Sequence, residues 1–105
     1  MTLAQLLSIG VLAGAASCGR APAGPPATHE VEIRDSRFAI PDRQFEAGDS
    51  IVFVNRDLVP HRVLFEGALS PELLRGHEWV IAIGAGGAVA CPYHPAMEGA
   101  ISLRR

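Results

Sequence analysis

From residue 29 onward, apolar and polar residues alternate with the period of two that is typical of β-strands. Val31 and Ile33 alternate with charged residues until Pro41, which predicts a strand with one buried face. The run over residues 50–55 is almost continuously apolar, which suits a strand covered on both faces. This first strand is expected to include Phe38 and Ile40, and further strands are expected over residues 61–65, 77–83, 88–91 and 99–103.

Turn residues separate these runs, and only one short segment favours a helix. In residues 70–76 (SPELLRG), Ser70 could cap a helix and Pro71 would occupy its first position, which predicts a single helical turn. There is no long amphipathic helix pattern and no internal repeat. The pattern therefore predicts an all-β protein, an antiparallel sandwich of about seven to eight short strands.

The chain opens with an apolar segment of a different kind. Residues 3–16 carry no charge and form the apolar region of a secretory signal, too short to span a bilayer comfortably. The following residues, Ala-Ala-Ser-Cys ending at Cys18, resemble a bacterial lipobox, in which the cysteine is lipidated and becomes the new N-terminus. The alternative is an ordinary secretory signal cut after Ala15 or Ala23. Either signal predicts export to the periplasm or cell envelope.

These features divide the chain into three parts. We expect a signal peptide over residues 1–17, a tether rich in Pro, Ala and Gly over 18–28, and one folded domain over 29–105. A lipidated Cys18 would hold that domain at a membrane surface, since acyl chains bury their carbons in the bilayer.

Composition narrows the function further. The 105 residues allow one small hydrophobic core. A net charge of −2 with 49% hydrophobic residues excludes a disordered chain. The same charge leaves no excess of basic residues with which to bind nucleic acid. All nine basic residues are arginine, which excludes Schiff-base chemistry. Cys18 and Cys91 are the two cysteines, and their unlike surroundings do not favour a disulfide.

The most informative segment is CPYHPAM, in which Cys91, His94 and Met97 follow one another at intervals of three. His61 lies upstream at the start of an expected strand, and in a sandwich such a strand start can meet a loop at the same end. A thiolate, two imidazoles and a weak thioether suit copper that cycles between Cu(I) and Cu(II). Zinc accepts Cys and His but has little use for a thioether.

Taken together, the segment from about Val31 to Leu103 resembles the cupredoxins, the type I blue copper proteins. The resemblance rests on the pieces EAGD, SIVFVNRD, VPH, CPYHPAM and EGAI in that order, and the two-residue gap between His94 and Met97 is similar to amicyanin rather than plastocyanin. It implies a Greek-key β-sandwich and one copper ion bound by four residues. These ligands are His61, Cys91, His94 and Met97.

The resemblance implies a one-electron carrier that is not an enzyme. Redox partner proteins would dock transiently near His94, where Leu58 and Pro60 extend the apolar surroundings. The alternative is a carrier or sensor that delivers copper rather than electrons. An enzyme with Cys91 as nucleophile lacks an identifiable orienting group, and we expect a monomer.

The remaining residues of interest have plainer interpretations. We expect His29 and His77 to be solvated strand residues and Trp79 to anchor the core. Two positions depart from the family pattern. Arg62 follows the first histidine where Asn or Thr is usual, and Gly87 and Val89 replace the aromatic residues that usually precede the copper-binding cysteine.

Overall fold

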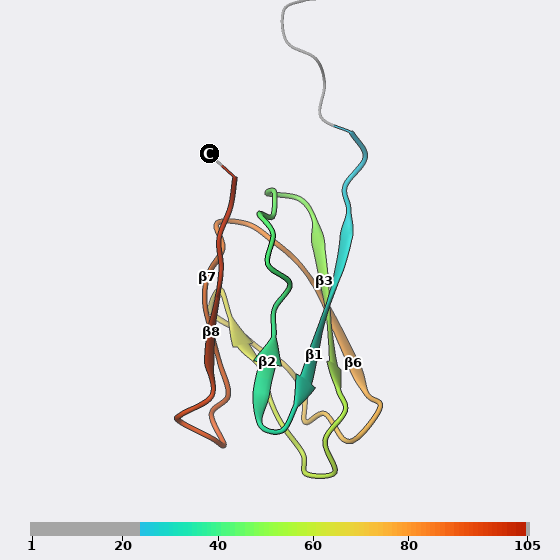
Figure 1. Cartoon of the computed structure of the whole chain (residues 1–105), viewed down its shortest axis with the longest axis vertical. Coiled ribbons are helices and arrows are strands. Elements are labelled where there is room, and N and C mark those ends of the chain that lie inside the picture. Colours follow the sequence, from blue (N-terminus) through green and yellow to red (C-terminus); the bar gives the residue numbers. More distant parts are fainter. Residues whose placement is uncertain (1–23, 105) are drawn as a thin grey trace, which may run out of the picture.

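The computed structural model describes residues 24–104, which form two β-sheets packed face to face (Figure 1). In chain order the strands are β1 (Thr28–Arg34), β2 (Arg37–Ala39), β3 (Ser50–Asn55), β4 (Leu64–Phe65), β5 (Ala68–Leu69), β6 (Glu78–Ala82), β7 (Gly87–Ala90) and β8 (Glu98–Ile101). Among these residues there is no helix, and hence none that could cross a membrane. The predicted all-β sandwich is confirmed. The expected signal peptide and Cys18 lie outside the described residues.

The first sheet has the strand order β2-β1-β3-β6. β1 pairs in parallel with β3, and the other neighbours in this sheet are antiparallel. Val31 and Ile33 on β1 are fully buried while Glu30 and Arg34 are exposed, as the alternation predicts. β3 lies between β1 and β6, and four of its six residues are buried while Ser50 and Val52 are partly buried, in keeping with its nearly continuous apolar sequence.

The second sheet has the order β5-β4-β7-β8 and is antiparallel throughout. Its inner face meets the first sheet through aromatic contacts, with the ring of Phe65 on β4 lying 6.3 Å from that of Phe53 on β3. Phe53 also packs on Phe38 and stacks with Trp79 at 5.9 Å. Trp79 is partly buried against the core, in keeping with the expected anchor.

Residues 61–76 differ from the sequence prediction. The expected strand over 61–65 shortens to Leu64–Phe65, and the helical turn predicted over 70–76 is wrong. The Ser70 hydroxyl accepts a hydrogen bond from the amide of Val63 instead of capping a helix, and Leu73 is buried. Cross-strand bonding and apolar burial therefore override the local capping signal.

His29 also departs from expectation, because it is buried rather than solvated. Its Nε2 atom lies 2.8 Å from Asp49 Oδ2, and its ring packs edge-on against Phe45. His77 is exposed, as expected, and its Nδ1 accepts a hydrogen bond from the Leu74 amide. The carboxylate partner explains how a polar imidazole enters the core.

The connections that matter for the site gather at one end of the sandwich. Figure 1 shows the β1–β2 turn, the connection from β3 to β4 and the β7–β8 connection together at the lower end. Residues 24–27 enter the domain at the opposite end, and the chain also finishes there. The fold thus separates the cysteine and histidine loops from the end at which residues 24–27 enter.

Candidate metal centre

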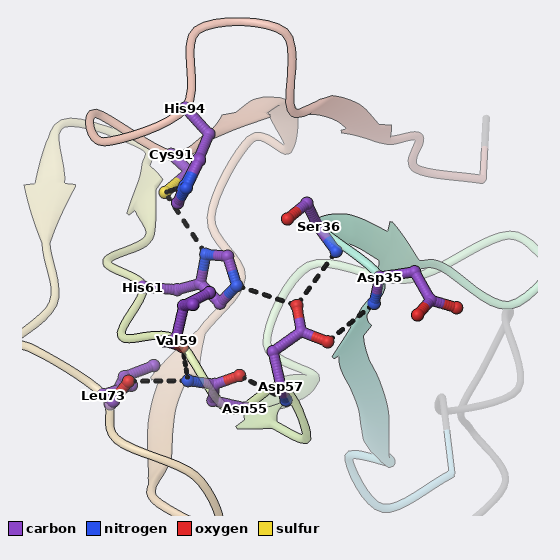
Figure 2. Close-up of polar contacts among 9 residues, drawn as sticks. All are labelled: Asp35, Ser36, Asn55, Asp57, Val59, His61, Leu73, Cys91 and His94. Carbon is purple, nitrogen blue, oxygen red and sulfur yellow. Dashed lines mark hydrogen bonds and ion pairs between the residues drawn. The ribbon is translucent and has the colours of Figure 1, made fainter.

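Three of the four predicted ligands meet at the lower end of the sandwich. The Sγ atom of Cys91 lies 3.8 Å from Nδ1 of His61 and 3.6 Å from Nδ1 of His94. One ligand atom from each residue lies within 4.8 Å of the other two. Figure 2 shows both imidazoles turned toward the sulfur, with His61 approaching from below and His94 from the β7–β8 connection.

The β7–β8 connection presents its ligands through two consecutive tight turns. Cys91 follows directly after β7, and the His94 amide donates a 3.0 Å hydrogen bond to the Cys91 carbonyl. The Met97 amide then donates to the His94 carbonyl at 2.8 Å. The spacing of three between the predicted ligands therefore matches the repeat of the turns that hold them.

His61 is held by backbone pairing rather than by a long strand. It exchanges two hydrogen bonds with Leu73, at 3.1 and 2.7 Å, in an isolated antiparallel bridge. Asn55, at the end of β3, donates from Nδ2 to the carbonyls of Leu73 and Val59. The buried Asn55 side chain thus ties the loop before His61 to the segment that pairs with it.

The spacing of the three donor atoms fits a bound metal. With metal–ligand bonds of about 2.0–2.3 Å, a sulfur and a nitrogen at a trigonal angle lie roughly 3.8 Å apart. The two sulfur–nitrogen distances of 3.8 and 3.6 Å match that geometry. One thiolate and two imidazoles in a trigonal arrangement are the donor set that suits copper.

Met97 is buried at 3% exposure and belongs to the same hydrophobic cluster as Cys91. Its main chain is tied to His94, so the residue lies in the loop that carries two of the converging donors. His61 and Cys91 are almost fully enclosed, at 0% and 1% exposure, whereas His94 is partly exposed. The site therefore has a closed interior and one edge at the surface.

The sequence prediction missed an acidic residue at the site. Asp57 Oδ2 lies 2.8 Å from Nε2 of His61, on the side of the ring that faces away from the sulfur (Figure 2). The amides of Asp35 and Ser36 donate to the same carboxylate. Burial raises the pKa of the Asp57 carboxyl, but these hydrogen bonds outweigh it and hold that pKa below its usual range.

A weak signal for Asp57 was present in the sequence. Asn55 ends the buried strand β3, and Asp57 follows two residues later, four residues before His61. The Asn55 side chain accepts a hydrogen bond from the Asp57 amide. Such a turn is typical of Asn at the end of an element. The pattern fixes the Asp57 backbone, but only the tertiary structure shows that its carboxylate meets an imidazole.

The two departures from the family pattern have different outcomes. Among the described residues, the buried Nε of Arg62 has no hydrogen-bond partner. Val89 is fully buried in the core, and Gly87 begins β7 with a φ of 126°. An L-residue rarely adopts that backbone angle, so the strand geometry explains the absence of an aromatic side chain at position 87.

The fold resembles solved structures of amicyanin. The reduced form of a tryptophan-to-tyrosine mutant of amicyanin superposes with a TM-score of 0.64 at 22% identity, covering 74% of this chain and 83% of that one. Amicyanin from Paracoccus versutus gives 0.63 at 21% identity, covering 76% and 84%. The chain has the cupredoxin fold. This confirms the fold that the sequence pieces predicted.

A further cupredoxin structure, the Cu(I) form of an amicyanin mutant altered at a methionine, gives a TM-score of 0.63 at 21% identity and covers 74% of this chain and 83% of that one. No family model matches the sequence, and no curated protein matches it. The likeness therefore lies in the three-dimensional arrangement. The cluster of His61, Cys91 and His94 sits in this cupredoxin fold as a group positioned for copper.

Proposed function

We propose that this protein is a one-electron carrier that holds a single copper ion. His61, Cys91 and His94 would bind the ion, and Met97 would be a weak fourth ligand. The observation that carries the proposal is the convergence of one sulfur and two nitrogens, with sulfur–nitrogen distances of 3.8 and 3.6 Å and all three atoms within 4.8 Å of one another. Amicyanin structures described as reduced and oxidized lend support, because they represent two redox states of this fold.

When bound, copper supplies the couple between Cu(I) and Cu(II). The protein supplies a rigid set of donors, since backbone bonds fix His61 and consecutive turns fix Cys91 and His94. Core packing around His61 and Cys91 excludes water from the closed side of the site. A preorganised site of this kind needs little rearrangement when an electron arrives or leaves, which favours fast transfer.

Partner proteins would dock at the edge where His94 is partly exposed. Exposed apolar residues lie on the two loops at the same end of the molecule, and Leu58 is 81% exposed. The exposed apolar residues on these loops are Leu58, Val59, Pro60, Pro92, Tyr93, Pro95 and Ala96. A small patch with few charges suits weak, transient encounters between redox proteins, and we propose that the carrier acts as a monomer and not as an enzyme.

We further propose that the protein works outside the cytoplasm, in the periplasm or cell envelope. The apolar segment over residues 1–17 would direct export, the tether over 18–28 would follow, and the copper domain would span 29–105. Lipidation of Cys18 would add a membrane anchor. Mass spectrometry of the N-terminal peptide tests this, and an unmodified peptide that starts well past Cys18 would exclude the anchor.

Copper chemistry is tested by adding Cu(II) to the metal-free protein and recording the visible spectrum. We expect an intense thiolate-to-copper charge-transfer band, which Cys91→Ser removes because oxygen replaces the thiolate. Cys18→Ser is the matched control and should keep the band. A colourless Cu(II) complex, or a band that survives in Cys91→Ser, would refute the proposed site.

A competing chelator separates electron transfer from copper delivery. An electron carrier retains its metal, so we expect the Cu(I) form to hold copper for much longer than minutes. Release to the chelator within minutes would favour a carrier or sensor that delivers copper. The burial of His61 and Cys91 supports retention, because the metal could leave only past the partly exposed His94.

A further inference from the structure

One carboxylate joins the β1–β2 turn to the first metal-binding histidine. Asp57 Oδ1 accepts a 2.6 Å hydrogen bond from the Asp35 amide, and Oδ2 accepts one of 2.9 Å from the Ser36 amide. The same Oδ2 atom lies 2.8 Å from Nε2 of His61. Figure 2 shows Asp57 between the turn and the imidazole, in contact with both.

The turn presents its amides to Asp57 because of an unusual backbone. Asp35 and Ser36 have φ angles of 52° and 56°, the left-handed values required at both central positions of a tight hairpin turn. Neither is glycine, so this backbone is unfavourable by itself. Two hydrogen bonds to Asp57 offset part of that cost and, in return, hold the carboxylate still.

This arrangement determines which nitrogen of His61 carries the proton. Two amide N–H groups donate to the oxygens of Asp57, which favours the ionised carboxylate, and an ionised carboxylate has no proton to give and can only accept from the ring. Nε2 must then be the donor, which leaves Nδ1 of the neutral imidazole without a proton. That bare nitrogen is the atom that faces Cys91 Sγ at 3.8 Å.

We propose that Asp57 is a positioning residue for the metal centre, which fixes the His61 ring with Nδ1 free to bind metal and makes that nitrogen a stronger donor. This inference rests on the proposed copper site. A negative group bonded to a ligand imidazole favours the metal ion of higher charge. Asp57 should therefore strengthen Cu(II) binding more than Cu(I) binding and lower the reduction potential.

Asparagine at position 57 is nearly isosteric but cannot reproduce this role. If its oxygen faced His61 and the Ser36 amide, its NH₂ group would confront the Asp35 amide. In the opposite orientation, the NH₂ group would face His61 and require Nε2 as an acceptor, which moves the ring proton to Nδ1. Either way the substitution loses a hydrogen bond or blocks the ligand nitrogen.

The matched control is Asp35→Asn. Asp35 is exposed, and its side chain points away from Asp57 in Figure 2. It binds Asp57 only through its backbone amide, which the substitution retains. Each variant removes one negative charge, and the two positions are neighbours in the fold. The difference between their copper affinities therefore measures the contact with His61 rather than the loss of a negative charge near the site.

The first measurement uses the metal-free wild-type protein, in which ¹⁵N NMR of His61 should show the neutral ring protonated at Nε2. The second compares the affinities of the variants for Cu(II) and Cu(I). For Asp57→Asn we expect Cu(II) affinity to fall about 10-fold to 100-fold, with a smaller loss for Cu(I). Each tenfold fall in the ratio of Cu(II) affinity to Cu(I) affinity raises the reduction potential by about 59 mV. Asp35→Asn should have the same affinities as wild type.

Two results would overturn the inference. One is a metal-free wild-type ring that carries its proton on Nδ1. The other is an Asp57→Asn protein whose ratio of Cu(II) to Cu(I) affinity equals that of Asp35→Asn. The NMR result needs no copper and no variant, so it tests whether Asp57 holds the His61 proton on Nε2 independently of the visible spectrum, which tests the copper site itself.

Discussion

At the residue scale, the buried pair of His29 and Asp49 predicts sensitivity to acid. The Asp49 carboxylate bonds to His29, and the amides of Ala27 and Glu46 also donate to it. The His29 bond, followed by these amides, holds the pKa of Asp49 below its ordinary value. Because the unfolded chain has a pKa of about 3.9, this stabilisation is complete above that pH and is lost as the pH falls through the folded pKa.

Asp49→Asn should therefore lower stability at neutral pH and flatten the loss of stability in acid. The measurement is urea unfolding of the metal-free protein between neutral pH and about pH 3, a range that spans the unfolded pKa. Asp42→Asn removes an exposed carboxylate and serves as the control, and its free energy of unfolding should fall with decreasing pH as steeply as that of wild type. An equally steep fall in Asp49→Asn would contradict the prediction.

The same scale shows why some site residues could be predicted and others could not. Cys91, His94 and Met97 share one short loop, so their chemistry and spacing can be read together. Asp57 and His29 gave no comparable signal, because each acquires its role from a partner on another segment. A carboxylate that binds an imidazole looks the same in sequence as one that only faces water.

At the scale of elements, the start of β7 depends on Gly86. Its φ is 79°, and a Cβ atom built there would lie 2.6 Å from the carbonyl oxygen of Ile101 on β8. Gly76 has a similar φ of 85° but no atom within 4 Å of such a Cβ. Comparing the two glycines separates backbone strain from steric overlap with the neighbouring strand.

We expect Gly76→Ala to destabilise the fold by about 1–3 kcal/mol through backbone strain alone. Gly86→Ala should lower the free energy of unfolding by roughly a further 1–3 kcal/mol, because β8 must also move away from the new Cβ atom. Denaturant midpoints of the two metal-free variants measure the difference. Equal losses would show that β8 accommodates the extra carbon without cost.

Element prediction succeeded where a segment's own pattern decided the outcome. The apolar run of β3 was sufficient to locate that strand. The single strand expected from residue 29 to Pro41 was wrong, because a tight turn at residues 35–36 divides it into β1 and β2, which pair with each other. Local pattern did not reveal that β1 and β3 pair in parallel, or that Leu73 would pair with His61 in place of a helical turn. Both pairings are set by which surfaces the whole sandwich must bury.

At the scale of the whole molecule, the sandwich separates the entry of the chain from the cluster of His61, Cys91 and His94. Residues 24–27 enter at one end, where the Asp49 carboxylate accepts a hydrogen bond from the Ala27 amide. The loops with His61 and Cys91 lie at the other end. A domain held through its N-terminus would therefore present its proposed copper edge away from the anchor, toward passing partners.

Copper should also stabilise the folded domain, because its proposed ligands lie far apart in the sequence and come together only when the chain is folded. His61 and Cys91 are 30 residues distant in sequence yet lie 3.8 Å apart when folded. An ion that binds only the folded state adds about 2.7 kcal/mol to the free energy of unfolding when its free concentration is 100 times the dissociation constant.

Unfolding midpoints at buffered free copper should therefore rise in wild type and in His77→Ala, whose histidine is exposed and outside the site. Cys91→Ser should lose most of that increase, and an equal increase in Cys91→Ser would place the stabilising ion elsewhere in the protein.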